Sequence, residues 1–216
     1  MKYKVAIFDL DGTVLATLED LANAVNHALE TNGYASHTIE EVRCMVGNGV
    51  ANLIWRTLPK NIDESIHAKV LADFKAYYRD HVNDCTKPYD GIPEMLKNLR
   101  DAGIYVGINS NKFDAALQNL CKIHFEGLYD YAAGECETTP KKPDPTAAER
   151  IIAAAGAKKC EAIYIGDSDV DIRTAENAGI DNAWVAWGFR RRNELGDAAP
   201  MHEFYDAKAL EAFLLS

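Results

Sequence analysis

The chain has 216 residues, of which 48% are hydrophobic and 26% are charged. Asp and Glu outnumber Lys and Arg by 33 to 23, and the resulting net charge of −10 has the wrong sign for a nucleic-acid-binding surface. No stretch approaches the roughly 18 uninterrupted apolar residues of a membrane helix, and the N-terminus lacks the apolar segment of a secretory signal. We therefore expect no nucleic-acid partner, no membrane segment and a cytoplasmic location. The five cysteines include no CxxC pair, so we expect reduced and mostly buried thiols rather than disulfides or a zinc site.

The first third of the chain predicts one strand followed by a series of helices. Residues 4–8 (KVAIF) form a short apolar run, which is typical of a strand covered on both faces of a parallel sheet. From Thr17 onward the apolar residues recur with helical spacing, and Thr17 is placed to cap that helix. Thr38 begins a capping-box pattern, and a long helix with one apolar face is expected after Asp63. No strand pattern occurs between residues 17 and 83.

The rest of the chain alternates strands with helices. Apolar strands are expected at residues 104–109, 131–133, 162–166 and within 182–187, with a last helix near 207–214. A helix is expected from about residue 111, and Asp144 with Pro145 fits the start of the helix that runs to residue 155. This alternation predicts an α/β fold with a Rossmann-like, doubly wound parallel sheet.

The predicted domains follow from the spacing between the first two strands of the α/β rhythm. About 70 residues separate these strands, whereas an ordinary crossover needs only about a dozen. We therefore expect an inserted α-helical cap domain at residues 16–85 and a core formed by residues 1–15 and 86–216.

Polar residues follow three of the predicted strands at their carboxyl ends. Because ligands bind at this edge of a parallel sheet, we expect these residues to surround one pocket. Carboxylates about 4 Å apart repel each other by about 4 kcal/mol at an effective dielectric constant of 20, so such a group needs a cation. Mg²⁺ prefers oxygen ligands and often accompanies phosphate, which makes it the expected cofactor. Its candidate ligands are Asp9, Asp11 and Asp167.

The two aspartates at the first strand exit are suited to phosphoryl transfer. Asp9 and Asp11 lie two residues apart, so their side chains point the same way on an extended backbone. One can attack phosphorus while the other transfers a proton to the leaving oxygen. Gly12 permits a tight turn that brings backbone amides near a phosphate. Lys142 would balance the charge, and Ser110 would hold a phosphoryl oxygen.

Four motifs resemble the signatures of the haloacid dehalogenase-like superfamily: DLDGT at 9–13, Ser110 in INSNK, Lys142 in KKPDP, and GDSDVD at 166–171. The resemblance covers nearly the whole chain. It implies that Asp9 is the nucleophile that becomes phosphorylated and that Asp11 is the general acid and base, with a backbone carbonyl that also binds Mg²⁺. It further implies that Asp167 is the third metal ligand, supported by Asp171. The helical insertion resembles a C1-type cap, which closes over the site and selects the substrate.

Within this superfamily the phrases VGNG, YDGIPEML, SNK and KPDPT most resemble phosphoglycolate phosphatases. This resemblance implies hydrolysis of a small phosphorylated metabolite, phosphoglycolate, through a phosphoaspartyl intermediate. The family commonly has Leu and Asp where this chain has Val14 and Ala16, so a carboxylate beyond the catalytic pair is missing. The candidate substrate-binding residues are Gly12, Thr13, Asn111, Arg43, Gly47 and Asn48.

Several of these residues also fit ordinary structural roles. The GDSDVD segment can cap a helix, and the glycines at 47 and 49 can end one. Arg43 can bind a substrate carboxylate or lie on a solvated helix face. Trp187, Gly188 and Phe189 can line the pocket mouth or simply pack.

Other functions remain open at this stage. They are a phosphosugar mutase of the β-phosphoglucomutase type, a pyrophosphatase or nucleotidase, and a phosphoaspartate signalling module without turnover. Receiver modules are about half this length, lack the cap and do not place a second aspartate two residues after the first. The sequence does not predict the oligomeric state.

Overall fold

The computed structural model describes residues 1–47 and 49–216. These residues divide into two compact units, one formed by residues 1–16 with 88–216 and the other by residues 17–87. The short strands β2 (Leu15–Ala16) and β3 (Lys87–Pro88) pair where the chain passes from one unit to the other. That the second unit acts as a cap over the first stays a prediction.

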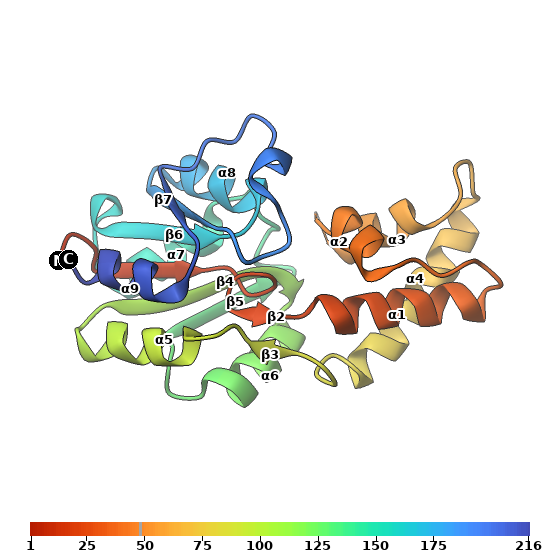
Figure 1. Cartoon of the computed structure of the whole chain (residues 1–216), viewed down its shortest axis with the longest axis horizontal. Helices are drawn as coiled ribbons and strands as arrows, with labels where there is room; N and C mark the ends of the chain where they lie inside the picture. The colour runs from red at the N-terminus through yellow and green to blue at the C-terminus, as the bar shows by residue number, and fades with distance from the viewer. Residues whose placement is uncertain (48) are drawn as a thin grey trace. The chain divides into compact units, whose positions relative to one another are not determined.

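The first unit is built on a six-stranded parallel sheet with the order β5-β4-β1-β6-β7-β8 (Figure 1). This finding confirms the predicted α/β fold class. From β1 the chain continues outward through β4 to β5 on one side, and it returns beside β1 to continue through β6 to β8 on the other. The direction of winding therefore reverses beside β1, which is where doubly wound sheets bind their ligands. The strands are β1 (Val5–Phe8), β4 (Tyr105–Phe113), β5 (Tyr131–Glu135), β6 (Ala162–Gly166), β7 (Asp181–Val185) and β8 (His202–Phe204).

Helices cover both faces of this sheet, which explains why its central strands are apolar throughout rather than alternating. On one face, Val5, Ile7 and Tyr164 pack with Ile151 of α7 and Ala175 of α8. Helices α5 and α9 contact each other and lie in front of the sheet in Figure 1. The helices of this unit are α5 (Ile92–Asp101), α6 (Asp114–Phe125), α7 (Thr146–Ala154), α8 (Asp169–Ala178) and α9 (Ala207–Leu214), with short 3₁₀ turns at Lys159–Glu161 and Arg192–Glu194.

Between residues 17 and 83, the described part of the second unit contains helices joined by loops and no strand, in agreement with the absence of strand patterns. Helix α1 packs against α2 and α4, and α3 contacts both α2 and α4. The predicted capping box at Thr38 is present, with its hydroxyl accepting from the backbone N–H of Glu41 at 3.2 Å. The helices are α1 (Leu18–Thr31), α2 (Ile39–Met45), α3 (Val50–Thr57) and α4 (Glu64–Asp80).

The predicted role of Thr17 as the cap of α1 is wrong. The Thr17 side chain makes no capping hydrogen bond, because this residue already has helical dihedral angles. The buried carboxylate of Asp20 instead accepts hydrogen bonds from the backbone N–H of Cys85 at 2.9 Å and of Thr86 at 2.9 Å. The Thr86 hydroxyl donates to the same carboxylate at 2.7 Å. Asp20 therefore ties the start of α1 to the segment that leads out of the helical unit.

Other sequence expectations need small corrections. Strand β4 continues to Phe113 instead of ending at residue 109, so α6 begins at Asp114 rather than near residue 111. Helix α7 begins at Thr146, one residue later than expected, and Asp144 accepts from its backbone N–H at 2.9 Å. The short strand β8 was not expected from the sequence. The expectation of mostly buried thiols is wrong, since Cys121 alone among the five free cysteines is buried.

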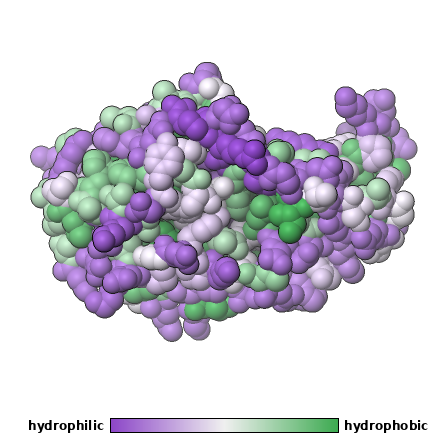
Figure 2. Space-filling model, in the orientation of Figure 1, coloured by the Kyte–Doolittle hydropathy of each residue, from purple (hydrophilic) through white to green (hydrophobic). Residues whose placement is uncertain are grey.

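The surface agrees with the charged composition. Figure 2 shows hydrophilic side chains over much of the face in view, with apolar residues gathered in several areas between them. Within residues 1–47 and 49–216, no helix combines the length and apolar character that crossing a bilayer would require.

Candidate active site

The register of three neighbouring strands brings the predicted motifs to one edge of the sheet. Phe8 in β1 pairs with Ile108 in β4 on one side and with Ile165 in β6 on the other. The residues that follow these positions therefore leave the sheet at the same level. They include Asp9 after β1, Ser110 in β4 and Asp167 after β6.

The centre of the site is a buried lysine shared by two carboxylates. Lys142 Nζ lies 2.6 Å from Asp9 Oδ1 and 2.7 Å from Asp171 Oδ1. Burial lowers the pKa of Lys142, but the charges of Asp171 and Asp9 outweigh this effect and hold it well above its usual range. The lysine therefore stays protonated between the two carboxylates. This geometry favours Lys142 over Lys141, whose ammonium lies 3.1 Å from the Glu135 carboxylate.

Asp171 is oriented from both sides. Its Oδ2 accepts hydrogen bonds from the Ser168 backbone N–H at 3.0 Å and from the Ser168 hydroxyl at 2.6 Å, while Oδ1 faces Lys142. The two residues form the capping box of α8, so the helix-capping role considered for GDSDVD is present. Because both of its oxygens are engaged, Asp171 fits a role in holding Lys142 better than one in binding a metal directly.

Asp167 is held by the loop that follows β7. Its Oδ2 accepts from the Phe189 backbone N–H at 2.6 Å, and its backbone carbonyl accepts from the Trp184 indole N–H at 2.9 Å. Burial raises the pKa of Asp167 to about 7, and the nearby charge of Asp171 adds to this effect. A bound cation would favour the ionised form of this carboxylate.

Glycines allow the backbone to pack tightly around Asp167. A Cβ atom on Gly188 would lie 2.2 Å from Asp167 Cβ and 2.4 Å from the carbonyl oxygen of Gly12. A Cβ atom on Gly12 would lie 2.6 Å from Asp167 Oδ2, and the φ angle of Gly12, +88°, also favours glycine. Gly12 therefore makes room for the third carboxylate as well as for the turn. Gly188 packs against the site, and the sequence alone left its role open.

Asp11 has a lysine of its own. Lys112 Nζ lies 2.9 Å from Asp11 Oδ1, and only 5% of the Lys112 side chain is exposed. Ser110 is buried, and its hydroxyl accepts from the Lys112 backbone N–H at 3.2 Å. Lys112 is the last residue of the INSNK motif, and the motif alone assigned it no role.

Asn111 faces the backbone of Lys142. Its Oδ1 accepts from the Lys142 N–H at 2.6 Å, and its Nδ2 donates to the Lys142 carbonyl at 3.2 Å. This pair of hydrogen bonds fixes the segment that carries the central lysine. Substrate binding by Asn111 stays a prediction, and its observed contacts fit a positioning role.

The carboxylates of this site fit a divalent cation. Carboxylate oxygens of Asp9, Asp167 and Asp171 all lie within 4.8 Å of one another. Burial raises the pKa of Asp9 well above its usual range, opposed by Lys142 and reinforced by Asp171 and Asp167. Together with Asp11, the described site holds four carboxylates and two ammonium groups, which leaves a formal charge of −2. One divalent cation would balance that charge. Asp11 directs its carboxylate to Lys112, so binding of a metal through its backbone carbonyl stays a prediction.

The other predicted substrate contacts are divided between the two units, with Thr13 in the first unit and Arg43 and Gly47 in the second. Arg43 forms a two-pronged ion pair with Glu40, at 2.9 and 3.1 Å, and its side chain is 9% exposed. The Gly47 carbonyl accepts from Arg56 at 2.9 Å, and Asn48 lies outside the described residues. Thr13 is buried in the first unit, and among the described residues its hydroxyl has no hydrogen-bond partner. Roles for these four residues in substrate binding stay predictions.

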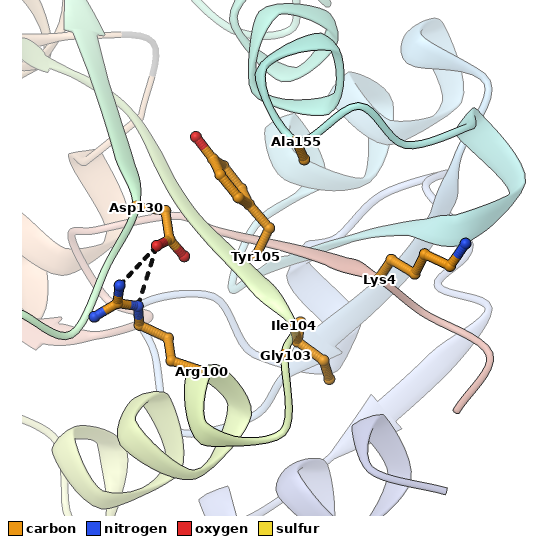
Figure 3. Close-up of a pocket in the computed structure, with 7 residues that line it drawn as sticks. All are labelled: Lys4, Arg100, Gly103, Ile104, Tyr105, Asp130 and Ala155. Atoms are coloured by element: carbon orange, nitrogen blue, oxygen red, sulfur yellow. Dashed lines mark hydrogen bonds and ion pairs between the residues drawn. The ribbon is translucent and has the colours of Figure 1, made fainter.

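A concavity of about 300 Å³ lies elsewhere on the first unit (Figure 3). Its lining includes Lys4, just before β1, and Tyr105, the first residue of β4, so it lies at the opposite edge of the sheet from Asp9. Figure 3 shows Arg100 turned toward Asp130, and their closest contact is 2.8 Å. Lys4 is paired with Glu161 at 2.6 Å. Because both cations are already paired, this concavity is a poor candidate for binding a phosphate.

Known proteins are similar to this chain in sequence and in fold. Residues 6–185 match the family model for haloacid dehalogenase-like hydrolases. Phosphoglycolate phosphatase from Pseudomonas syringae pv. syringae is 31% identical over 216 residues, which cover 96% of this chain and 78% of that protein. The enzyme of the same name from Cereibacter sphaeroides is 34% identical over 201 residues, covering 91% and 88%.

A solved structure extends this likeness to three dimensions. A protein from Lactobacillus delbrueckii subsp. bulgaricus, described as a candidate phosphoglycolate phosphatase, matches with a TM-score of 0.95 and 34% identity over the full length of both chains. The sequence motifs and the fold therefore lead to the same assignment. The chain belongs to the haloacid dehalogenase-like hydrolase family and is a hydrolase of phosphoric monoesters.

Proposed function

We propose that this enzyme is a magnesium-dependent phosphatase that hydrolyses phosphoglycolate through a phosphoaspartyl intermediate on Asp9. The main support is the buried cluster in which Lys142 bridges Asp9 and Asp171 beside Asp167. The names of the relatives from Pseudomonas syringae and Cereibacter sphaeroides support the choice of substrate.

In the first step, Asp9 attacks the phosphorus atom of the substrate. Its Oδ1 is held by Lys142, and this contact orients the carboxylate for attack. A bond forms between the carboxylate oxygen and phosphorus while the ester bond to the leaving oxygen breaks. Asp11 donates a proton to that oxygen, so an alcohol rather than an alkoxide departs. The Lys142 ammonium and the Ser110 hydroxyl stabilise negative charge during this transfer.

In the second step, the aspartyl phosphate is hydrolysed. Asp11, now a carboxylate, removes a proton from a water molecule whose oxygen attacks phosphorus. The bond between phosphorus and Asp9 breaks, which releases inorganic phosphate and restores both aspartates. The same pair of residues thus acts in both steps with the proton returned to Asp11.

Magnesium would be held by the carboxylates of Asp9 and Asp167, together with the backbone carbonyl of Asp11. When bound, it supplies positive charge to the phosphoryl oxygens. The buried carboxylates and the site's formal charge of −2 support this assignment. The Phe189 N–H orients Asp167, and Asp171 keeps Lys142 in place.

The test is hydrolysis of phosphoglycolate by the purified full chain with millimolar MgCl₂ and with excess EDTA. We expect phosphate release with Mg²⁺ only, and none from Asp9→Asn. The control Asp101→Asn makes the same chemical change on the surface, where Asp101 pairs with Lys97 at 2.5 Å, and should keep normal activity. Activity in Asp9→Asn equal to that of the unmodified chain would overturn the phosphoaspartyl mechanism.

A substrate panel separates the proposed activity from the other possibilities. It should include a hexose phosphate, pyrophosphate and a nucleoside monophosphate at equal concentration. If any of these compounds is turned over faster than phosphoglycolate, that compound is the better candidate for the substrate. A phosphorylated protein that persists for minutes without releasing phosphate would instead indicate a signalling module.

A further inference from the structure

Each of the two aspartates in the DLDGT motif has its own buried lysine. Lys142 contacts Asp9 at 2.6 Å, whereas Lys112 contacts Asp11 at 2.9 Å. Only 5% of each lysine side chain is exposed. The two cations reach the site from different segments, since Lys112 belongs to β4 and Lys142 lies in the loop before α7. Each aspartate is therefore paired with a different cation, Asp9 with Lys142 and Asp11 with Lys112.

Burying a lysine is unfavourable unless a charged partner offsets the free energy lost when the ammonium leaves water. Lys142 has two carboxylate partners and serves the predicted nucleophile. Lys112 adds a second buried ammonium that no predicted step requires. Asp11 is less buried than Asp9, with 20% of its side chain exposed compared with 9%, so Asp11 has more room to move.

We infer that Lys112 is a positioning residue for proton transfer, which holds the Asp11 carboxyl group where the leaving oxygen of the substrate departs. This inference rests on the proposed phosphatase function. The ion pair uses Oδ1 of Asp11 and leaves the other oxygen to carry the proton. Lys112 itself is fixed on β4, where its backbone N–H donates to the Ser110 hydroxyl at 3.2 Å.

The role of Lys112 can be separated from general damage by varying the leaving group. An alkyl phosphate must receive a proton as its ester bond breaks, whereas p-nitrophenolate departs as a stable anion without one. Hydrolysis of the aspartyl phosphate is common to all substrates and follows departure of the leaving group. The ratio of kcat/KM values for two substrates therefore reports on the first step alone.

The experiment compares phosphoglycolate, ethyl phosphate and p-nitrophenyl phosphate as substrates of the full chain with Mg²⁺. Proton transfer contributes about 100-fold or more to catalysis. In Lys112→Met, we expect kcat/KM to fall about 100-fold for both alkyl phosphates but less than about 5-fold for p-nitrophenyl phosphate. Lys112→Arg, which keeps the charge, should recover at least part of the loss. In an Asp11→Asn background, Lys112→Met should have little further effect, because the residue it positions is gone.

Two results would overturn this inference. Equal losses for all three substrates would indicate a general structural or electrostatic role. A loss confined to phosphoglycolate would indicate that Lys112 binds the substrate carboxylate. Lys97→Met, which removes a surface lysine paired with Asp101, is the matched control and should leave all three values unchanged. Thermal unfolding of each variant shows whether it is folded. If Lys112→Met is unfolded, Lys112→Gln, which also removes the charge, replaces it in the test.

The activity of the unmodified enzyme toward the same three substrates tests the proposed function separately. If it hydrolyses ethyl phosphate and p-nitrophenyl phosphate but not phosphoglycolate, the proposed substrate is wrong while the comparison of leaving groups still tests Lys112. If it hydrolyses none of the three with Mg²⁺, both proposals fail.

Discussion

Replacing Gly188 with alanine should displace Asp167 while leaving every predicted site residue chemically unchanged. The added Cβ would lie 2.2 Å from Asp167 Cβ and 2.4 Å from the Gly12 carbonyl oxygen. Non-bonded atoms prefer separations of about 3.5 Å, so one of these groups must move by about 1 Å. Neither neighbour is the free end of a flexible side chain. The loop at 187–190 or Asp167 itself must therefore shift.

The size of the effect follows from this displacement. Overpacking of a tight site costs about 1–3 kcal/mol of unfolding free energy. A misplacement of about 1 Å in catalytic geometry reduces activity by about 100-fold. We therefore expect Gly188→Ala to lower kcat/KM for phosphoglycolate by 10- to 100-fold and to weaken Mg²⁺ binding, because the loop N–H that orients Asp167 moves with Gly188.

The measurements are steady-state kinetics, calorimetric titration with Mg²⁺ and urea unfolding. Gly103→Ala is a control for stability: Gly103 has a φ angle of +85°, but its added Cβ would meet no atom within 4 Å. The left-handed backbone alone should cost about 1–2 kcal/mol there. Gly103→Ala should keep full activity despite this loss. If Gly188→Ala keeps activity and Mg²⁺ affinity within about 2-fold of the unmodified chain, the close packing around Asp167 does not control its position.

Three further predictions concern the buried charges. Lys142→Met should abolish turnover and lower the unfolding free energy by about 3–5 kcal/mol, because Asp9 and Asp171 would lose their shared cation. A loss of less than about 1 kcal/mol in urea unfolding would contradict this prediction. Asp20→Ala should lower the unfolding free energy by about 3 kcal/mol in the same assay, because two backbone N–H groups and a hydroxyl lose their acceptor. Unchanged stability would show that water takes the place of the Asp20 carboxylate as acceptor. Mg²⁺ at about 100 times its Kd should stabilise the chain by about 2.7 kcal/mol. EDTA should reverse this Mg²⁺-dependent stabilisation, and Asp167→Asn should remove it. Full stabilisation of the variant by Mg²⁺ would exclude Asp167 as a ligand.

The central strands could be predicted because their environment leaves a simple pattern. Residues buried on both faces of a parallel sheet must be apolar along their whole length, and Val5 to Phe8 are fully buried. Where such a run ends in polar residues, the strand exit is marked as well. Because parallel strands share one carboxyl edge, the sequence also predicted that Asp9 and Asp167 approach each other across 158 positions, and the structure brings their carboxylates together.

Contacts that depend on loops and long side chains leave no such pattern. Phe189 acts on Asp167 through its backbone N–H, which every residue except proline carries, so residue type gives no signal. Gly188 differs, since a glycine is a residue type that permits close approach of other atoms, but the sequence does not say which atoms approach it. The missing cap at Thr17 has a similar cause: its residue type suits an N-cap, but the tertiary structure gives it helical dihedral angles.

The unexpected length of β4 determines which groups the INSNK motif can reach. A helix beginning near residue 111 would turn successive side chains about 100° apart around one axis. On extended backbone, neighbouring side chains instead point to opposite faces. Asn111 accordingly bonds to the backbone of Lys142, while Lys112 reaches Asp11. The pairing of β4 with β5 extends to Phe113 and Glu135, past an irregularity after Asn109, and so carries the strand into this motif. Extending β4 thus lets one short segment position the central lysine and hold the predicted general acid.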